Sequence, residues 1–514
     1  MTRILSALAA LIAALSCFPA AARAVISLPT DFASAPVVGG LDQPTSMAFL
    51  PDGRLLFTEQ RTGRVRMVVN GHLAATDPVV TVPQLVATGN EQGLLAIAVD
   101  PGWPSRPYVY LYHDRTGGFM RLVRYTASGD VSNPLGENLT LCCPLLVIDD
   151  IPDQVQFHNG GALRFGPDGH MYLSMGEDTD QCGAQDSTTL KGELLHLDVS
   201  RLPAIGTGPV PRALLIAPDH PLVSPDSNAM LVWAYGMRNP FRFHVDPVTG
   251  LVYLADVGET SWEELDEVHP GDNLGWPLRE GFASHIVQGS CTEPPGALYR
   301  DPLIVYDHSQ GNAIVATGVY RPAVNGNENW PIAYHGDVFY SDYYTGFLRR
   351  LKKTGGTWAP APAPGQPNAD DWATGLASIA DGLVGPDGAL WCLRQFDDSF
   401  SPQSGSITRI RSTATVGVAE SRLTERPLSG APNPFTGHSV LAFTLAARAP
   451  VRLSVYDLGG RRIAVLFEGE ARAGETRVTW SGADEGGRPV APGLYLARLE
   501  RPEGTETVRL MRLR

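Results

Sequence analysis

Five similar tight turns recur between residues 37 and 411, and most of them are followed by segments of β type. The turns are Leu50-Pro-Asp-Gly53, Asp100-Pro-Gly102, Gly166-Pro-Asp-Gly169, Asp246-Pro-Val-Thr-Gly250 and Gly385-Pro-Asp-Gly388. Alternating aliphatic or aromatic residues follow most of them, and helical periodicity is scarce. This irregular repeat predicts an all-β fold, most economically a β-propeller with six four-stranded blades.

The chain is too long for one ordinary domain. It has 514 residues, 43% of them hydrophobic, so it can bury a sizeable core. After Arg411 a polar stretch leads into strands separated by Gly-rich turns. We therefore predict a propeller over 25–411, a linker over 412–430 and a small Ig-like β-sandwich over 431–514.

The N-terminus has the pattern of a secretory signal peptide. Residues 1–24 contain Arg3, an apolar stretch and the small-residue pattern Ala22-Arg-Ala24. Cys17 leaves a lipoprotein as the alternative, although the residue three before it is Ala14 instead of a large aliphatic. No later apolar run could span a bilayer. We expect a secreted or cell-surface protein, with the periplasm as the alternative location.

The charge balance limits the class of partner. The chain carries 54 acidic and 40 basic residues, which gives a formal net charge of −14, and it contains no basic run. This balance argues against a surface for nucleic acid or for an anionic membrane. It fits a soluble protein that acts on neutral or cationic small molecules.

Five cysteines remain once the signal peptide is removed, namely Cys142, Cys143, Cys182, Cys291 and Cys392. Because the number is odd, at least one should be unpaired within the chain. The absence of a Cys-x-x-Cys pair argues against a zinc site. Our first choice is a disulfide from Cys142 or Cys143 to Cys182.

Two titratable residues are placed symmetrically about one of the turns. His158 and Glu177 lie equally far from Gly166-Pro-Asp-Gly169, so a regular hairpin sets them opposite each other. A carboxylate that orients an imidazole suits a general base. The alternative is a buried structural histidine that is hydrogen-bonded to a glutamate.

The segment around Asp246-Pro-Val-Thr-Gly250 repeats this symmetry with Arg238 and Gly258. If both hairpins point their turns the same way, the base, the Arg238-Asn239 pair and the Gly258-Glu259 backbone converge on one face. Arg238 has a plainer alternative, in which it ties neighbouring blades together through backbone carbonyls. The long segments 175–230 and 259–300 are expected to carry functional loops on this face.

Four stretches in this order resemble the soluble pyrroloquinoline quinone-dependent glucose/sorbosone (aldose sugar) dehydrogenase family. They are Glu91-Gln-Gly-Leu-Leu95; His158-Asn-Gly-Gly161 with Phe165-Gly-Pro-Asp-Gly169; Tyr235-Gly-Met-Arg-Asn-Pro240; and Asp256-Val-Gly-Glu-Thr-Ser-Trp-Glu-Glu264 with Asn273-Leu-Gly-Trp276. The C-terminal region resembles the Ig-like or FlgD-like sorting domains of secreted bacterial proteins, on Pro432-Asn-Pro-Phe435 and Tyr456-Asp-Leu-Gly-Gly-Arg461. That resemblance implies a T9SS-like role in sorting or cell-surface attachment.

The dehydrogenase resemblance implies oxidation of the anomeric carbon of an aldose to a lactone, with electrons passed on to an external acceptor. It implies that His158 takes a proton from the anomeric hydroxyl while hydride passes to the quinone, and that Glu177 orients His158. It also implies that Arg238 stabilises negative charge on the quinone and that Asn239 contacts it.

The resemblance extends to a metal ion and to the residues around the quinone. Backbone carbonyls of Gly258 and Glu259 match those that hold Ca²⁺ against the cofactor. Glu91 stands near the position of a family residue beside the quinone. The acidic run from Glu263 to Glu267 is either a further calcium site or a solvated face. His170, His196 and His244 lie in strand-like patterns and are expected to have packing roles.

Other positions depart from the family pattern. Tyr344, Ser378 and Ala380 stand where quinone-binding members place a Lys and two Arg around the three carboxylates, and losing such cations weakens binding. The candidates to replace them are Arg321, Arg349 and Arg394. Phe157 also precedes the histidine where glucose-oxidising members have an Asp, so the substrate preference does not transfer.

Two further functions fit the same scaffold. One is a non-enzymatic propeller that binds carbohydrate or protein after losing the quinone's cationic surroundings. The other is a propeller hydrolase of the lactonase type, which the four quinone-family stretches favour less. Uptake of the quinone, or its failure, discriminates between them and the dehydrogenase.

Overall fold

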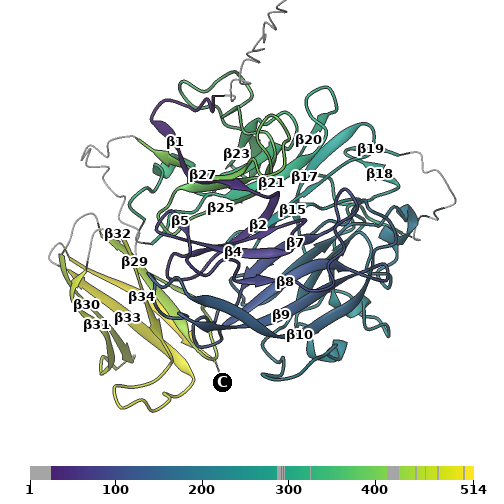
Figure 1. Cartoon of the computed structure of the whole chain (residues 1–514). Coiled ribbons are helices and arrows are strands. Elements are labelled where there is room, and N and C mark those ends of the chain that lie inside the picture. The colour runs from purple at the N-terminus through teal and green to yellow at the C-terminus, as the bar shows by residue number, and fades with distance from the viewer. Residues whose placement is uncertain are drawn as a thin grey trace, which may run out of the picture. The chain divides into compact units, whose positions relative to one another are not determined.

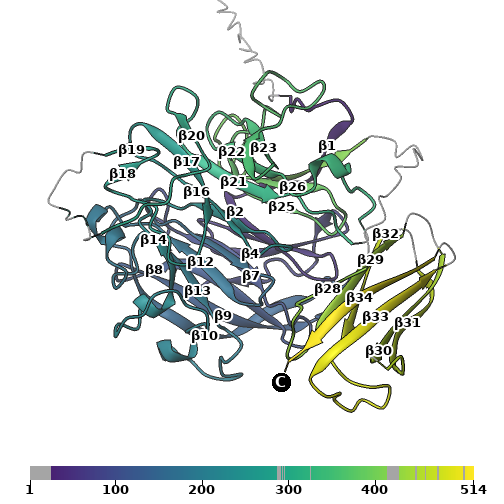
Figure 2. The same cartoon turned by 180° about the vertical axis from the view of Figure 1, so that it is seen from behind.

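The computed structural model describes residues 25–285, 291, 293, 296–324, 326–413, 428–445, 449–457, 459–471, 474–501 and 504–513 (Figures 1 and 2). The chain divides into two compact units, Met1–Thr413 and Ala414–Arg514. The described secondary structure consists of strands apart from four short 3-10 helices, so the all-β prediction is confirmed. The predicted signal peptide and most of the predicted linker lie outside the described residues, and the domain boundaries stay predictions.

The described part of the first unit contains six antiparallel sheets and one small hairpin. The first three sheets are β2 (Pro44–Phe49), β3 (Leu55–Glu59) and β4 (Arg64–Val69) with β5 (His72–Leu73) and β6 (Val80–Thr81); β7 (Leu94–Val99), β8 (Tyr108–Arg115), β9 (Phe119–Gly129) and β10 (Leu139–Pro152); and β11 (Ala162–Phe165), β12 (Met171–Met175), β13 (Glu193–Leu197) and β14 (Val232–Tyr235).

The other three sheets complete the unit. They are β15 (Arg242–Val245), β16 (Val252–Asp256), β17 (Trp262–Val268) and β20 (Ile304–Asp307); β21 (Ile314–Val319), β22 (Val338–Asp342), β23 (Leu348–Thr354) and β24 (Thr357–Pro360); and β25 (Ile379–Val384), β26 (Leu390–Arg394), β27 (Gly405–Ser412) and β1 (Phe32–Leu41). The hairpin is β18 (Arg279–Glu280) with β19 (Ala283–Ser284), and the 3-10 helices are η1 (Gln181–Gln185), η2 (Arg212–Leu214), η3 (Ala229–Leu231) and η4 (Ile332–Tyr334).

The first strands of the six sheets contact one another in a ring. Strand β2 contacts β7, β7 contacts β11, and the series continues through β15, β21 and β25 back to β2. The N-terminal strand β1 pairs with β27, so residues from both ends of the unit complete the sixth sheet. The first strands therefore surround one axis.

The turns form because an aspartate side chain binds the backbone that follows it. In the β11–β12 hairpin, Asp168 Oδ1 accepts the His170 N–H, and Ala162 pairs with Ser174. In the β15–β16 hairpin, Asp246 accepts the Val248 N–H and the Thr249 hydroxyl. These are the local hydrogen bonds for which Asp is favoured in turns.

Both faces of an inner sheet are covered by its neighbours. In the sheet that contains β12, Leu173 and Leu195 face the core shared with the preceding sheet, whereas Tyr172 and Leu194 face the core shared with the following one. All five residues of β12 are buried, as are those of β13 and β16. The sequence of a strand that is covered on both faces is a nearly continuous apolar run, without the alternation of apolar and polar residues that a half-exposed strand has.

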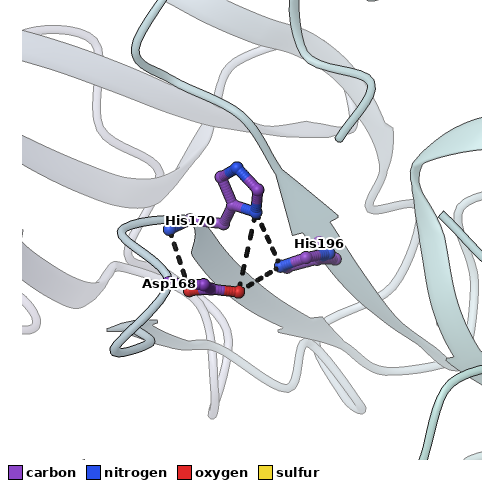
Figure 3. A group of neighbouring side chains, drawn as sticks. All are labelled: Asp168, His170 and His196. Carbon is purple, nitrogen blue, oxygen red and sulfur yellow. Dashed lines mark hydrogen bonds and ion pairs between the residues drawn. The ribbon is translucent and has the colours of Figure 1, made fainter. Parts of the chain in front are cut away.

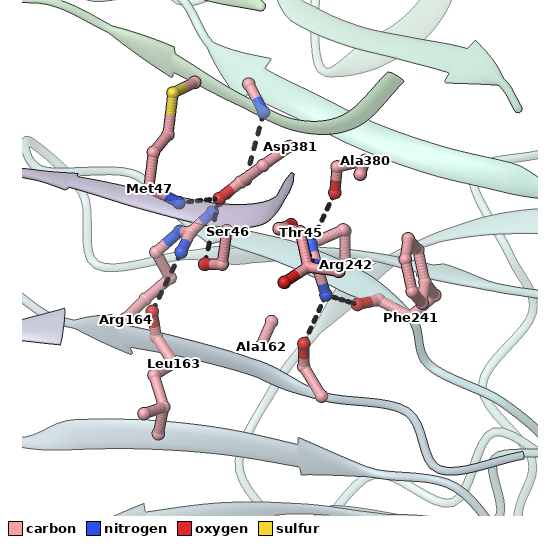
Figure 4. Close-up of polar contacts among 12 residues, drawn as sticks. Thr45, Ser46, Met47, Ala162, Leu163, Arg164, Phe241, Arg242, Ala380 and Asp381 are labelled. Carbon is pink, nitrogen blue, oxygen red and sulfur yellow. Dashed lines mark hydrogen bonds and ion pairs between the residues drawn. The ribbon is translucent and has the colours of Figure 1, made fainter. Parts of the chain in front are cut away.

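Arg242 joins the first strands from inside the ring (Figure 4). Its fully buried guanidinium donates to the carbonyls of Ala380 at 2.6 Å, Thr45 at 2.5 Å and Phe241 at 2.7 Å, and also to that of Gly161. A second cation, the half-buried Arg164, pairs with Asp381, which also accepts the Met47 N–H. These contacts connect strands β2, β11, β15 and β25.

The second unit has two antiparallel sheets. They are β28 (Ser429–Ala431), β29 (Ser439–Leu445) and β32 (Gly474–Trp480), and β31 (Arg462–Ala471), β30 (Ala449–Asp457), β33 (Gly493–Arg501) and β34 (Gly504–Arg512). Both sheets contribute to one hydrophobic core, in which Trp480 lies against Phe435 and Tyr495. The Ig-like assignment stays a prediction. Within the described residues, no helix has the length and apolar character that a membrane crossing requires.

Replacing Arg242 tests whether the ring depends on it. Arg242→Met should lower the free energy of unfolding of this unit by at least ~3 kcal/mol, because several buried carbonyls lose their donor at about 1–3 kcal/mol each. Arg242→Lys keeps the charge but not the planar fork and should lie between the two. Thermal unfolding followed by near-UV circular dichroism measures the change, with the more exposed Arg411→Met as control. Equal stability of the Met variant and the control would contradict this role.

Candidate functional site

His158 and Glu177 meet at the end of the β11–β12 hairpin opposite its turn. His158 Nδ1 lies 2.7 Å from Glu177 Oε1, and the Glu177 side chain is only 1% exposed. An ionised carboxylate can only accept, so Nδ1 carries the proton and Nε2 is left with its lone pair. Glu177 Oε2 has no hydrogen-bond partner among the described residues. The pair has the geometry predicted for an oriented base.

The backbone around His158 explains the two glycines that follow it. His158 itself has φ of +59°, a conformation that non-glycine residues rarely adopt. A Cβ on Gly160 would lie 2.6 Å from the Gly176 nitrogen, and one on Gly176 would lie 1.9 Å from the His158 carbonyl oxygen. The two backbone segments therefore touch directly, and strain of this kind is often kept at functional sites.

The Glu91 side chain links the backbone of His158 to the side chain of Asn239. Its Oε2 accepts the His158 N–H at 2.9 Å and the Asn239 side-chain amide at 3.2 Å. Asn239 Oδ1 in turn accepts the Gly160 N–H at 3.0 Å. The structure thus brings both predicted cofactor contacts to the site, where their described hydrogen bonds go to the protein and fix the loop that carries His158.

Arg238 belongs to the same network. The Arg238 carbonyl accepts the Glu177 N–H at 3.0 Å, and the backbone N–H groups of Arg238 and Asn239 donate to Asp256 at 2.8 and 2.7 Å. The guanidinium lies over the Trp276 ring and donates to the Val257 carbonyl at 3.0 Å. Its buried Nε has no hydrogen-bond partner among the described residues. The base and the cation therefore share one site.

Backbone N–H groups of the turn after β16 donate hydrogen bonds to one carboxylate. Glu280 Oε1 accepts four of them, from residues 259, 260, 261 and 262. Burial raises the pKa of Glu280, but these N–H groups outweigh it and hold the pKa below its ordinary value. The carbonyls of Gly258 and Glu259 accept no hydrogen bond from the described residues, so they remain available to a hard cation.

The acidic run on β17 is not a solvated face. Glu263, Glu264 and Asp266 are all buried, and both Asp266 oxygens have no hydrogen-bond partner among the described residues. Of the two alternatives for this run, the solvated face was wrong, because sheets cover β17 on both sides. Burial raises the pKa of Glu263 to about 8, although the Ile314 N–H favours its ionised form.

The predicted disulfide was wrong. Cys182 is bonded to Cys291, whereas Cys142 and Cys143 are exposed and Cys392 is buried and free. The partner comes from the long segment after β19, and contacts to Glu259 bring the two segments together. Gln181 donates to Glu259 at 3.1 Å, and His285 lies 3.0 Å from it. No local pattern shows that these two loops meet.

The three positions that depart from the family pattern offer no cation. The Tyr344 side chain is 57% exposed; burial raises its pKa, and the Glu91 charge raises it further, so the two side chains are close. Ser378 and Ala380 are buried, and the Ala380 carbonyl binds Arg242.

The suggested replacement cations are engaged elsewhere. Arg321 forms an ion pair with Asp246 at 2.6 Å. Asp246 lies at the turn of the β15–β16 hairpin, which is the end away from His158. Arg349 pairs with Asp371 at 2.8 Å, and Arg394 donates to the Ala377 carbonyl at 2.7 Å. Among the described residues, none of the three is thus free to replace the missing cations as suggested.

Sequence reasoning missed two residues that shape the site. Gln60 donates to the carbonyls of Glu91 at 2.9 Å and of Gln92 at 3.1 Å, and thereby holds the Glu91 loop. Glu280 holds the Gly258 turn. Neither lies in a repeated motif, and the only signal for Glu280 is an isolated acid following a turn that exposes several N–H groups.

A pocket of about 560 Å³ adjoins the site. It is lined by Phe157 and by segments from the Glu91 and His158 loops, namely residues 88–89, 92, 154–156 and 179. Phe157 is partly exposed there. Its wall includes Phe157, the residue before His158, but not His158 itself.

An alanine at residue 160 tests whether the glycine contact positions His158. Gly160→Ala combines a left-handed φ of +62° with a 2.6 Å clash, so it should cost about 1–3 kcal/mol beyond the left-handed penalty. Gly71→Ala has φ of +80° and no atom within 4 Å, so it reports that penalty alone. Chemical denaturation measures both. Equal losses in the two variants would contradict a tightly packed loop.

The buried Glu263 carboxyl predicts a pH dependence of stability. Because its pKa rises from an ordinary 4.5 to about 8 on folding, the folded state gains stability at low pH that is lost as the pH rises through 8. The stability of the native chain relative to Glu263→Gln should therefore fall between about pH 5 and pH 9. Thermal midpoints across this range measure it, and a constant difference would refute the raised pKa.

Comparisons with known proteins show which proteins this chain is similar to. The sequence profile of the family described as glucose/sorbosone dehydrogenase matches residues 41–398. The aldose sugar dehydrogenase YliI of Escherichia coli is 26% identical over 271 residues, which are 51% of this chain and 68% of YliI. Human Hedgehog-interacting protein is 27% identical over 234 residues, 41% of this chain and 31% of that protein.

A solved structure shares the fold. It is the pyrroloquinoline quinone-bound form of aldose sugar dehydrogenase from Streptomyces coelicolor, with a TM-score of 0.56 and 24% identity, and the match covers 75% of this chain and 99% of that one. The chain spans from 31% to 68% of the length of these two relatives. Since the family profile covers well over half of the sequence, the chain belongs to the glucose/sorbosone dehydrogenase family.

Proposed function

We propose that this protein is a secreted oxidoreductase that oxidises the anomeric carbon of aldose sugars to lactones, with pyrroloquinoline quinone and Ca²⁺ as cofactors. The observation that carries the proposal is the His158 Nδ1 contact with Glu177 in the same network as Arg238. Family membership and the similarity to YliI, an aldose sugar dehydrogenase, support it. An external acceptor takes the electrons onward.

His158 is the proposed base. With Nδ1–H held on Glu177, Nε2 accepts the proton of the anomeric hydroxyl, and the resulting imidazolium is stabilised by the adjacent carboxylate. A bound quinone would supply the acceptor for the hydride from the same carbon, so that the sugar would lose two electrons and two hydrogens in all. Glu177 acts through His158 and is a positioning residue.

Arg238 would hold the oxygens of the quinone. Its buried Nε has no hydrogen-bond partner in the part of the chain that the structure describes, and its position is fixed by Val257 and the Trp276 ring. A fixed cation beside oxygens that gain negative charge stabilises them most where water is excluded. Glu91 and Asn239 would help to position His158, because they accept hydrogen bonds from the backbone N–H groups of residues 158 and 160.

The donor set after β16 fits calcium. Two backbone carbonyls, those of Gly258 and Glu259, are the kind of oxygen ligands that Ca²⁺ accepts, and Glu280 fixes their turn by binding the N–H groups.

The fit is good for the oxygens of the quinone and poor for its three carboxylates. Tyr344 offers one phenol, whereas Ser378 and Ala380 are buried. We therefore expect the chain to bind the quinone more weakly than family members with cations at these positions.

The remaining expectations complete the proposal. The ring of first strands supports a six-bladed propeller over 25–411. Two sheets around one core support an Ig-like sorting or attachment domain over 431–514. The sequence of residues 1–24 supports export.

A binding protein without redox activity is the second candidate. Human Hedgehog-interacting protein is named for an interaction, and the three departing positions weaken the quinone site. Under this alternative, His158 and Glu177 form a structural pair. The chain would then bind a sugar or a protein without taking up the quinone.

Reconstitution tests the enzyme proposal. The purified chain with the quinone and Ca²⁺ should reduce an artificial dye when given aldoses, and His158→Gln should lower kcat by about 10²–10⁴-fold, the usual contribution of a general base. His158→Gln should still bind the quinone, as judged from the absorption of the bound cofactor. His72→Gln, at an exposed histidine, is the matched control.

Other outcomes would decide against it. Failure of the unsubstituted chain to take up the quinone, together with binding of a sugar or protein, would establish the binding alternative. Unchanged turnover in His158→Gln would remove the proposed base.

A further inference from the structure

A second group of chemically active side chains lies at the other end of the β11–β12 hairpin, at its turn (Figure 3). Asp168 and His170 flank Gly169 in the turn, and His196 comes from β13, where it pairs with Tyr172. His196 is 1% exposed, whereas Asp168 and His170 are partly open to solvent. The proposed sugar site does not use any of these three side chains.

Three ligand atoms converge here. His196 Nε2 lies 3.0 Å from Asp168 Oδ2 and 3.2 Å from His170 Nδ1, and the third side of the triangle, His170 Nδ1 to Asp168 Oδ2, is 3.6 Å. Nitrogen and oxygen ligands bound to a tetrahedral zinc ion at ~2.0–2.1 Å are separated from one another by about 3.3 Å. The three atoms therefore already have the spacing of one face of such a site.

Hydrogen bonds alone satisfy this triangle poorly. The carboxylate oxygen only accepts, and each neutral imidazole nitrogen either donates or accepts. If His196 Nε2 donates its proton to Asp168, it has no lone pair left to accept a hydrogen bond from His170. The contact between the two imidazole rings is then not a hydrogen bond. If His196 Nε2 instead donates its proton to His170 Nδ1, no proton lies between His170 Nδ1 and the Asp168 carboxylate oxygen. The lone pairs of these two atoms then repel each other. A cation at the centre attracts all three atoms at once.

The second nitrogen of His196 gives an independent indication. His196 Nδ1 is buried without a hydrogen-bond partner among the described residues, and the Asp219 carboxylate lies 3.6 Å from it. Histidines that bind metals usually direct their other N–H to a carboxylate, which orients the ring and raises its basicity. Asp219 stands in that position and needs to approach only slightly.

The site is also preorganised. The His196 ring is held between Tyr172 and Trp233, with ring centroids 4.5 and 4.4 Å away. Asp168 is fixed by accepting the His170 N–H with its other oxygen at 3.0 Å. Binding would therefore cost little ordering of these side chains.

We propose that Asp168, His170 and His196 bind one divalent transition-metal ion of the zinc class, with water completing the coordination from the open side. Two imidazoles and one carboxylate suit Zn²⁺ or Co²⁺, whereas Ca²⁺ and Mg²⁺ prefer oxygen ligands alone. The ion would tie the β11–β12 turn to β13 and so stabilise this sheet. Its presence does not require that the chain oxidise sugars.

Metal titration of the untagged full-length chain tests the proposal. After removal of transition metals with a chelator, and with Ca²⁺ kept in excess throughout, Co²⁺ should bind one to one and give the visible absorption of a nitrogen- and oxygen-ligated ion. Zn²⁺ should displace it and raise the thermal midpoint, because a ligand that binds only the folded state stabilises that state. Trp233 lies against His196, so Co²⁺ should also quench part of the tryptophan fluorescence.

Substitutions assign the ion to these residues. His170→Ala and Asp168→Asn, at the two partly exposed positions, should each weaken Co²⁺ binding at least tenfold, whereas His72→Gln should not. Failure of the unsubstituted chain to bind Co²⁺ or Zn²⁺ would overturn the proposal. Undiminished binding in both His170→Ala and Asp168→Asn would also overturn it, since the metal would then lie elsewhere. If one variant does not fold, the other decides.

Discussion

The buried Arg242 guanidinium is the interaction on which the arrangement of the ring depends. Where first strands of several sheets surround an axis, some of their carbonyls point inward and have no strand partner, and an unpaired buried carbonyl is costly. Arg242 donates to the carbonyls of Ala380, Gly161, Phe241 and Thr45, and at 3.4 Å to that of Leu95. The Gly161 carbonyl belongs to the loop that carries His158. One buried charge thus sets both the packing of the sheets and the backbone beneath the candidate site.

The candidate site repeats one arrangement, in which a buried or half-buried carboxylate accepts backbone N–H groups and leaves the neighbouring functional groups free. Glu91 binds the His158 loop, Asp256 binds the N–H groups of Arg238 and Asn239, and Glu280 binds the turn after Gly258. Hydrogen bonds to an ionised acceptor are short and strong, so they fix backbone that has no regular secondary structure. The imidazole, the guanidinium and two carbonyls then remain available to a ligand, because other groups satisfy the backbone around them.

The sequence predicted those parts of the site that depend on one hairpin at a time. The pairing of His158 with Glu177 follows from equal distances to a turn, and the placement of Arg238 follows in the same way. Contacts between separate loops could not be predicted from the sequence. The Cys182–Cys291 disulfide, for example, joins two long segments that share no sequence pattern. The buried acids of β17 were misjudged because a polar strand looks exposed until both of its faces are known to be covered. The role of His196 was missed because its register against the Asp168 turn is set across another strand.

The β11–β12 hairpin carries reactive side chains at both of its ends, and strand geometry keeps them apart. From His170 to Glu177 the chain runs seven residues, or roughly 20 Å at about 3.3 Å per residue. At this separation the direct interaction between a charge bound at the turn and the His158 imidazole is weak, on the order of 1 kcal/mol or less at an effective dielectric constant of about 20. Any influence of a metal at the turn on the base must therefore pass through the packing of β12. Since all five residues of β12 are buried between two sheets, the strand is already held there without a metal, which makes the two ends thermodynamically separable.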